Sequence, residues 1–140
     1  IRALEICRAT GKPFSAFRKK GSKNRIFDTL YIGLSAEREL VYDRINRRVD
    51  LMMEEGLLDE AKELFPRRHL NALNTVGYKE LFKFLEKEWE LETAVSEIKK
   101  NTRRFAKRQF TWFRKNEAIN WFEAGSPPSK IISFLEEKIT

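Results

Sequence analysis

Apolar residues recur at helical spacing through most of this sequence and alternate in only two short stretches. The helical pattern predicts helices over 2–10, 36–55, 58–65, 76–85 and 92–113, and a last helix capped by Ser126. Alternation predicts strands over 27–34 and 118–122. Two strands are too few for a sheet with its own core. We therefore expect a mainly α fold with one or two short strands, cut from a larger α/β protein.

Capping and helix-breaking residues stand where these helices are expected to begin or end: Gly11, Ser35, Gly56 and Pro66. Pro127 and Pro128 would occupy the first turn of the last helix. Residues 12–26 are basic and polar. We expect them to form a mobile loop.

Composition narrows the class of protein. The 140 residues are 41% hydrophobic, which is enough for the core of one ordinary domain. The single cysteine, Cys7, excludes an intrachain disulfide and a cysteine-rich zinc site, and it favours a reducing, cytoplasmic location. No apolar run approaches the roughly 20 residues that cross a bilayer, so no membrane partner is expected. Because the chain opens on Ile1 and reads at once as part of a helix, we expect a piece of a longer protein.

The charge balance points to an anionic partner without identifying one. The formal net charge is +7, and the isoelectric point is about 9.6. Such a balance fits both a nucleic-acid-binding protein and a protein that is merely basic. The placement of the charges has to decide between them.

The helix expected over 92–113 separates cations from apolar residues. At about 100° per residue, six cations share one half of its surface: Lys99, Lys100, Arg103, Arg104, Lys107 and Arg108. The other half carries Leu91, Ala94, Val95, Ile98, Phe105, Ala106, Trp112 and Phe113. Like charges four residues apart destabilise a helix by a few tenths of a kcal/mol per pair, and a merely solvated face would mix its signs. We therefore favour a single-sign face that binds phosphates.

Two polar residues, Thr102 and Gln109, fall inside the apolar arc. A buried polar side chain without a partner costs about 1–3 kcal/mol. Either each residue bonds the nearby backbone, or each reaches a nucleobase or phosphate at the edge of a cleft.

An arginine interrupts the apolar stripe of the helix over 36–55. The stripe consists of Val41, Ile45, Val49 and Met52. Arg48 falls in its middle with Arg44 beside it, and a buried guanidinium needs an anion. The anion is either Asp43 or Asp50 of the same helix, or a phosphate bound in a cleft. The residues alone favour the structural ion pair.

Three stretches carry more specific patterns. They are RALEI with TGKP (2–6 and 10–13), RINRRVDLM followed by GL (44–52 and 56–57), and TVGYKE with NTRRFAKRQFTWFR (75–80 and 101–114). In order and spacing, these stretches resemble the tRNA dimethylallyltransferase (isopentenylpyrophosphate transferase) family, from near residue 1 to about 122. The glycine-rich phosphate loop of that family is not found in this sequence.

The resemblance implies an enzyme that transfers a dimethylallyl group from dimethylallyl diphosphate to the exocyclic amine of the adenosine 3′ of the anticodon. It implies a P-loop-like α/β core, a helical insertion that grips the tRNA anticodon stem-loop, and Mg²⁺ in the full-length enzyme. We also expect a monomer. Residues 1–26 would be the end of that insertion with a basic loop. Residues 27–140 would be the C-terminal part of the core. We expect this chain to be inactive by itself and to supply no Mg²⁺ ligand.

The resemblance also assigns residues to roles. Arg48 corresponds to the arginine that contacts the diphosphate, which favours the phosphate over the ion pair. The tRNA-binding residues would be Ile1, Arg2, Asn74, Thr75, Val76, Gly77, Tyr78, Lys79, Arg103, Arg104, Lys107, Arg108, Gln109, Phe110, Thr111, Trp112, Phe113 and Arg114. Two other hypotheses stay open: a non-catalytic helical RNA-binding module, and a domain whose acidic protein partner takes the basic face.

Overall fold

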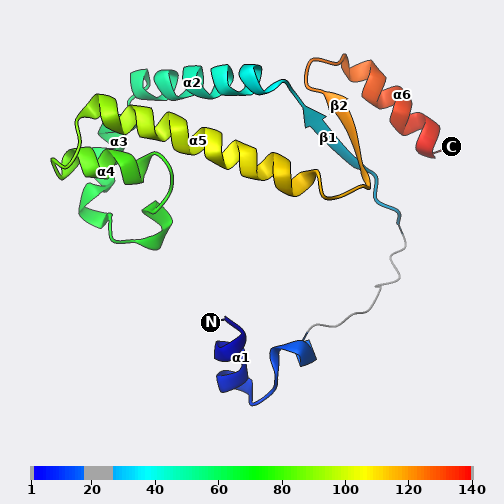
Figure 1. The fold of residues 1–140 in the computed structure, drawn as a ribbon, viewed down its shortest axis with the longest axis horizontal. Coiled ribbons are helices and arrows are strands. Elements are labelled where there is room, and N and C mark those ends of the chain that lie inside the picture. Colours follow the sequence, from blue (N-terminus) through cyan, green and yellow to red (C-terminus); the bar gives the residue numbers. More distant parts are fainter. Residues whose placement is uncertain (1, 18–26, 140) are drawn as a thin grey trace.

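Helices make up most of the chain over the residues that the computed structural model describes, 2–17 and 27–139 (Figure 1). The α-helices are α1 (Arg2–Thr10), α2 (Arg38–Glu54), α3 (Leu57–Leu64), α4 (Tyr78–Leu85), α5 (Leu91–Phe113) and α6 (Pro128–Ile139). Two strands, β1 (Tyr31–Ser35) and β2 (Ile119–Glu123), accompany them, with short 3₁₀ turns at Phe14–Phe17, Phe65–Arg67 and Asn71–Leu73. The prediction of a mainly helical chain with two short strands is confirmed.

Glycines in the left-handed backbone region separate several of these helices, as their spacing predicts. Gly11 has φ +66°, and its N–H donates to the Cys7 carbonyl at 2.9 Å, which ends α1. Gly56, with φ +102°, stands between α2 and α3. The loop expected over 12–26 contains a 3₁₀ turn at Phe14–Phe17, and its residues 18–26 lie outside the described part of the chain.

The capping role predicted for Ser35 is wrong. Ser35 is the last residue of β1, and its Oγ donates to the Phe122 carbonyl of β2 at 3.3 Å. Its own carbonyl accepts the Ala124 N–H at 2.7 Å, so pairing with β2 holds this residue extended. Glu37 takes the N-cap position of α2, and its side chain makes no capping bond. The strand also begins at Tyr31, four residues later than expected.

The two strands pair in parallel, with Tyr31 opposite Ile119 and Ser35 opposite Glu123. Helices α2 to α5 form the connection between them, so both strands end at the same edge of the sheet. Gly33 allows this pairing, because a Cβ there would lie 2.7 Å from side-chain atoms of Ile119 and Trp121. Half of the residues of the two strands are exposed and none is fully buried, as expected for strands without further neighbours.

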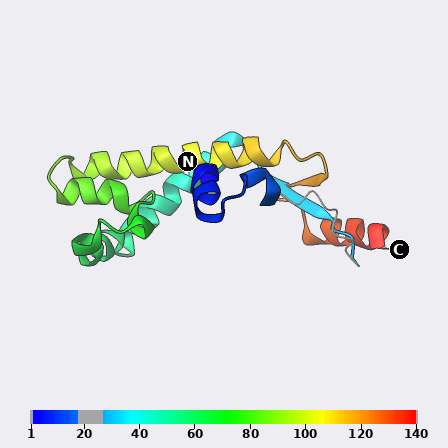
Figure 2. The same cartoon turned by 90° about the horizontal axis from the view of Figure 1, so that it is seen from below.

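The core lies among α2, α3, α4 and α5, at the end of the molecule away from the sheet (Figures 1 and 2). Its buried apolar residues are Val49, Leu57, Ala61, Leu81, Phe82, Ala94 and Ile98. Two of them, Ala94 and Ile98, come from the first half of α5. Burial of that half fixes the rotation of the whole 23-residue helix, including the end that projects toward the sheet.

The packing at Ile98 gives a first testable prediction. Ile98→Val removes one methyl group from a side chain that is 2% exposed, and we expect it to lower the free energy of unfolding by about 1 kcal/mol. Ile132→Val, the same change at a residue that is 53% exposed on α6, is expected to change it by less than about 0.5 kcal/mol. Urea unfolding of both variants measures the difference, and equal losses would contradict this account of the core.

Candidate nucleic-acid interface

Helices α2 and α5 run antiparallel and are joined by polar contacts along their length. Lys99 Nζ lies 2.5 Å from Asp50 Oδ1, and Arg103 Nη1 donates to Asn46 Oδ1 at 2.6 Å. The Arg103 guanidinium also lies 5.8 Å from the centre of the Tyr42 ring. These contacts determine which side of α5 faces α2 and which side faces solvent.

The cationic face of α5 is not of a single sign, which corrects the sequence-based expectation. Lys99 is paired with Asp50 of α2, and Lys100 Nζ lies 2.6 Å from Glu97 Oε1 on its own helix. Arg103 is turned toward α2. The helical projection treated α5 in isolation and therefore could not show which cations its neighbours neutralise.

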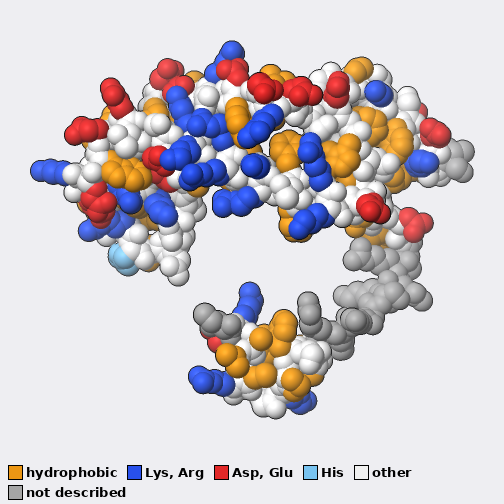
Figure 3. Space-filling model, in the orientation of Figure 1, with side chains coloured by type: hydrophobic (Ala, Val, Ile, Leu, Met, Phe, Trp, Pro, Cys, Tyr) orange, Lys and Arg blue, Asp and Glu red, His pale blue; other side chains and the backbone are white. Residues whose placement is uncertain are grey.

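Four cations remain exposed in a row along α5 and its C-cap: Arg104, Lys107, Arg108 and the C-cap residue Arg114. We call them the basic stripe. Figure 3 shows Lys and Arg side chains gathered over α5 on the face in view. The Arg104 and Arg108 positions lie one helical turn apart, about 6 Å, which is close to the spacing of successive phosphates in a nucleic-acid strand. This geometry suits a polyanionic backbone.

The apolar arc of α5 is covered only along its first half. Its second half carries three aromatic residues that are about half exposed or more: Phe105, Trp112 and Phe113. The Trp112 and Phe113 rings meet edge to face at 4.9 Å. Exposed aromatic rings beside arginines can stack on unpaired bases.

The two polar residues of this arc behave differently. Thr102 Oγ1 donates to the Ile98 carbonyl one turn earlier at 2.7 Å, so the first alternative, a bond to the nearby backbone, holds for Thr102. Gln109 is exposed and lines an apolar hollow between α5 and the sheet, next to Gly33 and Trp121. Its amide is therefore available at the rim of that hollow.

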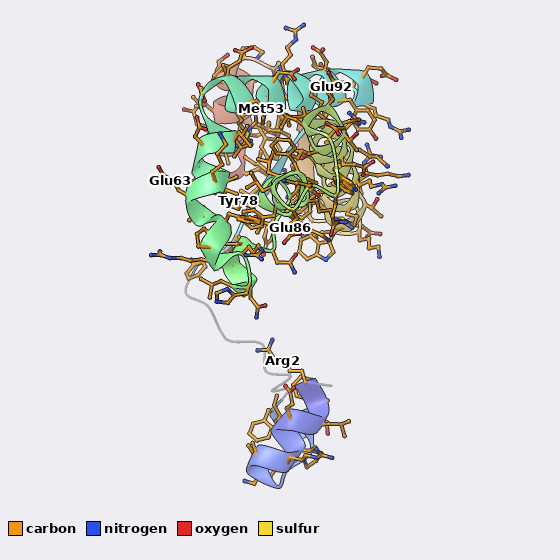
Figure 4. The ribbon with its side chains drawn as sticks, turned by 90° about the vertical axis from the view of Figure 1, so that its left-hand side faces the viewer. Arg2, Met53, Glu63, Tyr78, Glu86 and Glu92 are labelled. Atoms are coloured by element: carbon orange, nitrogen blue, oxygen red, sulfur yellow. The ribbon has the colours of Figure 1, made fainter. Side chains whose placement is uncertain are left out.

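The residues predicted over 74–79 form the turn that leads into α4 and the first two positions of that helix. Gly77 adopts φ +110°, and its N–H donates to Glu80 Oε2 at 2.8 Å. Tyr78 stacks on Phe82, and its hydroxyl donates to Glu60 Oε1 of α3. That hydrogen bond to the carboxylate, followed by partial burial, raises the pKa of Tyr78. Figure 4 shows Tyr78 on the side of α4 that faces α3, where Glu63 is labelled.

The expectation that Arg48 is buried on an apolar stripe is wrong, because Arg48 is exposed. Asn46 faces α5, and two residues further along a helix the side chain points to roughly the opposite side. The ion-pair alternative fails as well. Asp43 Oδ2 is paired with Arg47 Nε at 3.1 Å, and Asp50 is paired with Lys99.

A cleft of about 600 Å³ opens where the ends of β1 and β2 meet the start of α2 and the end of α5. Lys107, Phe110 and Thr111 line it from α5, and Arg114 lines it from the C-cap of that helix. Ligands of open α/β sheets bind at this edge, beyond the carboxyl ends of parallel strands. Arg38 and Tyr42 of α2 also line the cleft, joined by a 3.0 Å hydrogen bond, and neither was predicted from the sequence as a site residue. Their spacing of four residues directly after a strand was the available signal.

Comparison with known proteins assigns the chain to a family. A family profile described as IPP transferase matches residues 1–116. The chain belongs to the IPP transferase family. A tRNA dimethylallyltransferase of Christiangramia forsetii is 60% identical over 139 residues. Among solved structures, the tRNA isopentenylpyrophosphate transferase of Bacillus halodurans is 42% identical with a TM-score of 0.72, and a eukaryotic dimethylallyltransferase acting on tRNA is 27% identical with a TM-score of 0.77.

These matches cover nearly all of this chain but only part of each relative. Each covers 99% of this chain, against 46% of the Christiangramia protein, 42% of the Bacillus chain and 40% of the eukaryotic chain. The chain thus spans less than half the length of these relatives. The family resemblance based on the three sequence stretches is confirmed.

Within this IPP transferase chain, the structure brings together two of the predicted groups of residues. The turn over 74–79 and the α5 residues over 103–114 are linked through Glu80, which Asn101 Nδ2 contacts at 2.9 Å. Arg48 stands apart from them on the other side of α2, and Arg2 lies on α1, away from α5 in Figure 1. Ile1 lies outside the described residues.

No group of three or more His, Cys, Asp or Glu residues that could share a metal ion is found over 2–17 and 27–139. Over the same ranges, no helix is long and apolar enough to span a bilayer.

Proposed function

We propose that this chain is the C-terminal part of a cytoplasmic tRNA dimethylallyltransferase, which moves a dimethylallyl group from its diphosphate to the exocyclic amine of the adenosine 3′ of the anticodon. The observation that carries the proposal is the family match over residues 1–116, together with the relatives' names. Residues 1–26 would end the tRNA-gripping insertion, and 27–140 would complete the catalytic core.

The proposed reaction is a direct displacement. The exocyclic amine nitrogen attacks the allylic carbon, the new C–N bond forms as the C–O bond to diphosphate breaks, and diphosphate leaves with that electron pair. The amine then gives up one proton to a base. A cation beside the diphosphate lowers the barrier by neutralising the charge that develops on the leaving group.

Within this reaction we assign Arg48 to the diphosphate and the basic stripe to the phosphates of the anticodon stem. Arg48 is exposed on α2 and faces away from the α5 contacts, so its guanidinium is available to an anion. The described residues offer no group of acidic ligands for the Mg²⁺ that the resemblance implies.

A transfer assay with the full-length enzyme tests the reaction. Labelled dimethylallyl diphosphate should deliver its label to an anticodon stem-loop that carries adenosine 3′ of the anticodon. A stem-loop with guanosine at that position is the matched control, because guanine has no amine at the corresponding ring position, and it should accept no label. Equal labelling of both stem-loops, or of neither, would contradict the proposal.

Binding by the 140-residue chain alone tests the basic stripe without the chemistry. If the four stripe cations each neutralise about one phosphate, log K should fall with log[salt] at a slope of about −3 to −4. A titration of the anticodon stem-loop across salt concentrations measures that slope. RNA binding of this kind, combined with no transfer by the full-length protein, would instead favour a non-catalytic RNA-binding module.

A further inference from the structure

Glu80 is the single charged side chain that is buried among the described residues, with 3% of its surface exposed. A buried carboxylate is costly unless several hydrogen bonds compensate it. Glu80 has two such bonds, and they come from different parts of the fold. Its Oε2 accepts the Gly77 N–H at 2.8 Å, and its Oε1 accepts from Asn101 Nδ2 of α5 at 2.9 Å.

The Asn101 side chain carries this connection to the surface. Because the carboxylate only accepts hydrogen bonds, it holds the NH₂ group of Asn101 toward α4 and leaves the amide oxygen pointing away from the core. That oxygen accepts a hydrogen bond from Arg104 Nη1 at 3.3 Å. The chain of contacts therefore runs from the backbone of Gly77, through Glu80 and Asn101, to a cation of the basic stripe.

We propose that Glu80 is a positioning residue for RNA binding: it sets the orientation of the Asn101 amide, and through it the Arg104 guanidinium, relative to the turn over 74–79. The inference rests on the proposed function, because it assumes that Arg104 and this turn meet the same RNA. The hydrogen bond to Asn101 uses one N–H group of the Arg104 guanidinium, which leaves other donors of the same group for a phosphate.

The capping of α4 alone does not require this arrangement. The bond from Gly77 to Glu80 closes the first turn of α4 and would serve that purpose with either a glutamate or a glutamine side chain. The second bond, from Asn101, adds a second donor, and only a carboxylate can accept from both donors at once, one on each oxygen. Substitutions that separate the two bonds can therefore distinguish a structural role from a positioning role.

Glu80→Gln in the full-length enzyme is the central variant. The new amide can still accept the Gly77 N–H through its oxygen, but its NH₂ group then meets the NH₂ group of Asn101. The Asn101 amide turns over to relieve this contact and presents a donor to Arg104. We expect the Kd for the anticodon stem-loop to rise about three- to tenfold, with a salt slope shallower by nearly one.

Two further variants keep the inference falsifiable. Asn101→Ala leaves the Gly77 bond of Glu80 intact and removes the link to Arg104, so it should weaken RNA binding to the same extent even if Glu80→Gln does not fold. Combining Glu80→Gln with Asn101→Asp reverses donor and acceptor while keeping the net charge. The new amide donates to the new carboxylate, which accepts from Arg104, and the Kd should return to within about twofold of the wild type.

The possible results of these RNA-binding measurements distinguish a positioning role of Glu80 from a purely structural one. A Kd that is unchanged in both single variants overturns the positioning role, as does a double variant that folds but shows no recovery. Wild-type enzyme that binds no stem-loop RNA overturns this inference together with the proposed function. Thermal unfolding of each variant shows whether a change of Kd accompanies a loss of structure, and the recovery in the double variant is a result that a purely structural role does not give.

Discussion

Replacing Arg48 by alanine is expected to lower the turnover of the full-length transferase by about 10²- to 10³-fold while leaving its affinity for tRNA unchanged. This is the size of effect found when one positioned donor to a developing negative charge is removed. The structure supports a role toward a ligand, because both candidate partners within α2 are already occupied, Asp43 by Arg47 and Asp50 by Lys99. Single-turnover kinetics and a separate tRNA-binding measurement would show the two effects independently.

The neighbouring residue provides a matched control for this prediction. Arg47 lies on the same helix with its side chain 81% exposed, and its ion pair with Asp43 stays on the surface of α2. Arg47→Ala should change turnover by less than about twofold, since such exposed pairs contribute little. Arg48→Lys keeps the positive charge but loses the planar guanidinium, which can donate two parallel hydrogen bonds to a phosphate. This variant should therefore retain only part of the wild-type activity. If Arg48→Ala lowered turnover and tRNA affinity equally, that result would contradict the assignment of Arg48 to the diphosphate.

Reversing two charges of the basic stripe should have the second large effect. For the paired substitutions Arg104→Glu and Arg108→Glu, we expect the affinity for the anticodon stem-loop to fall about 100-fold, because two charge-assisted contacts to phosphate become repulsive. The slope of log K against log[salt] should become shallower by about two, since two fewer counterions are released. Fluorescence anisotropy at several salt concentrations yields both quantities.

A control with the same change of net charge distinguishes the stripe from a general attraction. Lys130→Glu with Lys138→Glu reverses two exposed cations of α6, which lies beyond the sheet from α5 in Figure 1. At physiological salt the Debye length is about 8 Å, so charges on α6 should affect RNA bound at α5 by less than about threefold. Equal losses in both double variants would show that net charge, and not this surface, attracts the RNA.

Much of the local structure could be predicted from the sequence because its causes are local. The apolar spacing of α5 and the glycines at 11 and 56 gave the positions of their elements to within one or two residues. The prediction failed at Ser35, where a serine in front of a helical pattern looks like a cap. Its hydroxyl instead bonds Phe122, which lies 87 residues further along the chain. A contact between residues so far apart in the sequence cannot be predicted from the residues around Ser35.

The candidate site shows the same division between local and distant causes. The sequence placed the cations on one half of α5. The pairing of Lys99 with Asp50 and of Arg103 with Asn46, however, depends on α2. A projection of α5 alone therefore overestimated the number of cations available to a ligand. Burial of Arg48 was predicted from a stripe on α2. The core, however, uses the side of α2 that carries Val49 and leaves Arg48 exposed.

The sequence by itself therefore determined the family, the helical class and the residues that carry the cationic surface, because each of these is set by residue type and by spacing along one element. The tertiary structure alone decided which cations remain available, where the cleft opens beyond the two strands, and that Glu80 joins the turn over 74–79 to α5. The physical reason is that burial and hydrogen bonding depend on neighbours brought together by folding, and a carboxylate such as Glu80 acquires its partners only when two distant segments meet.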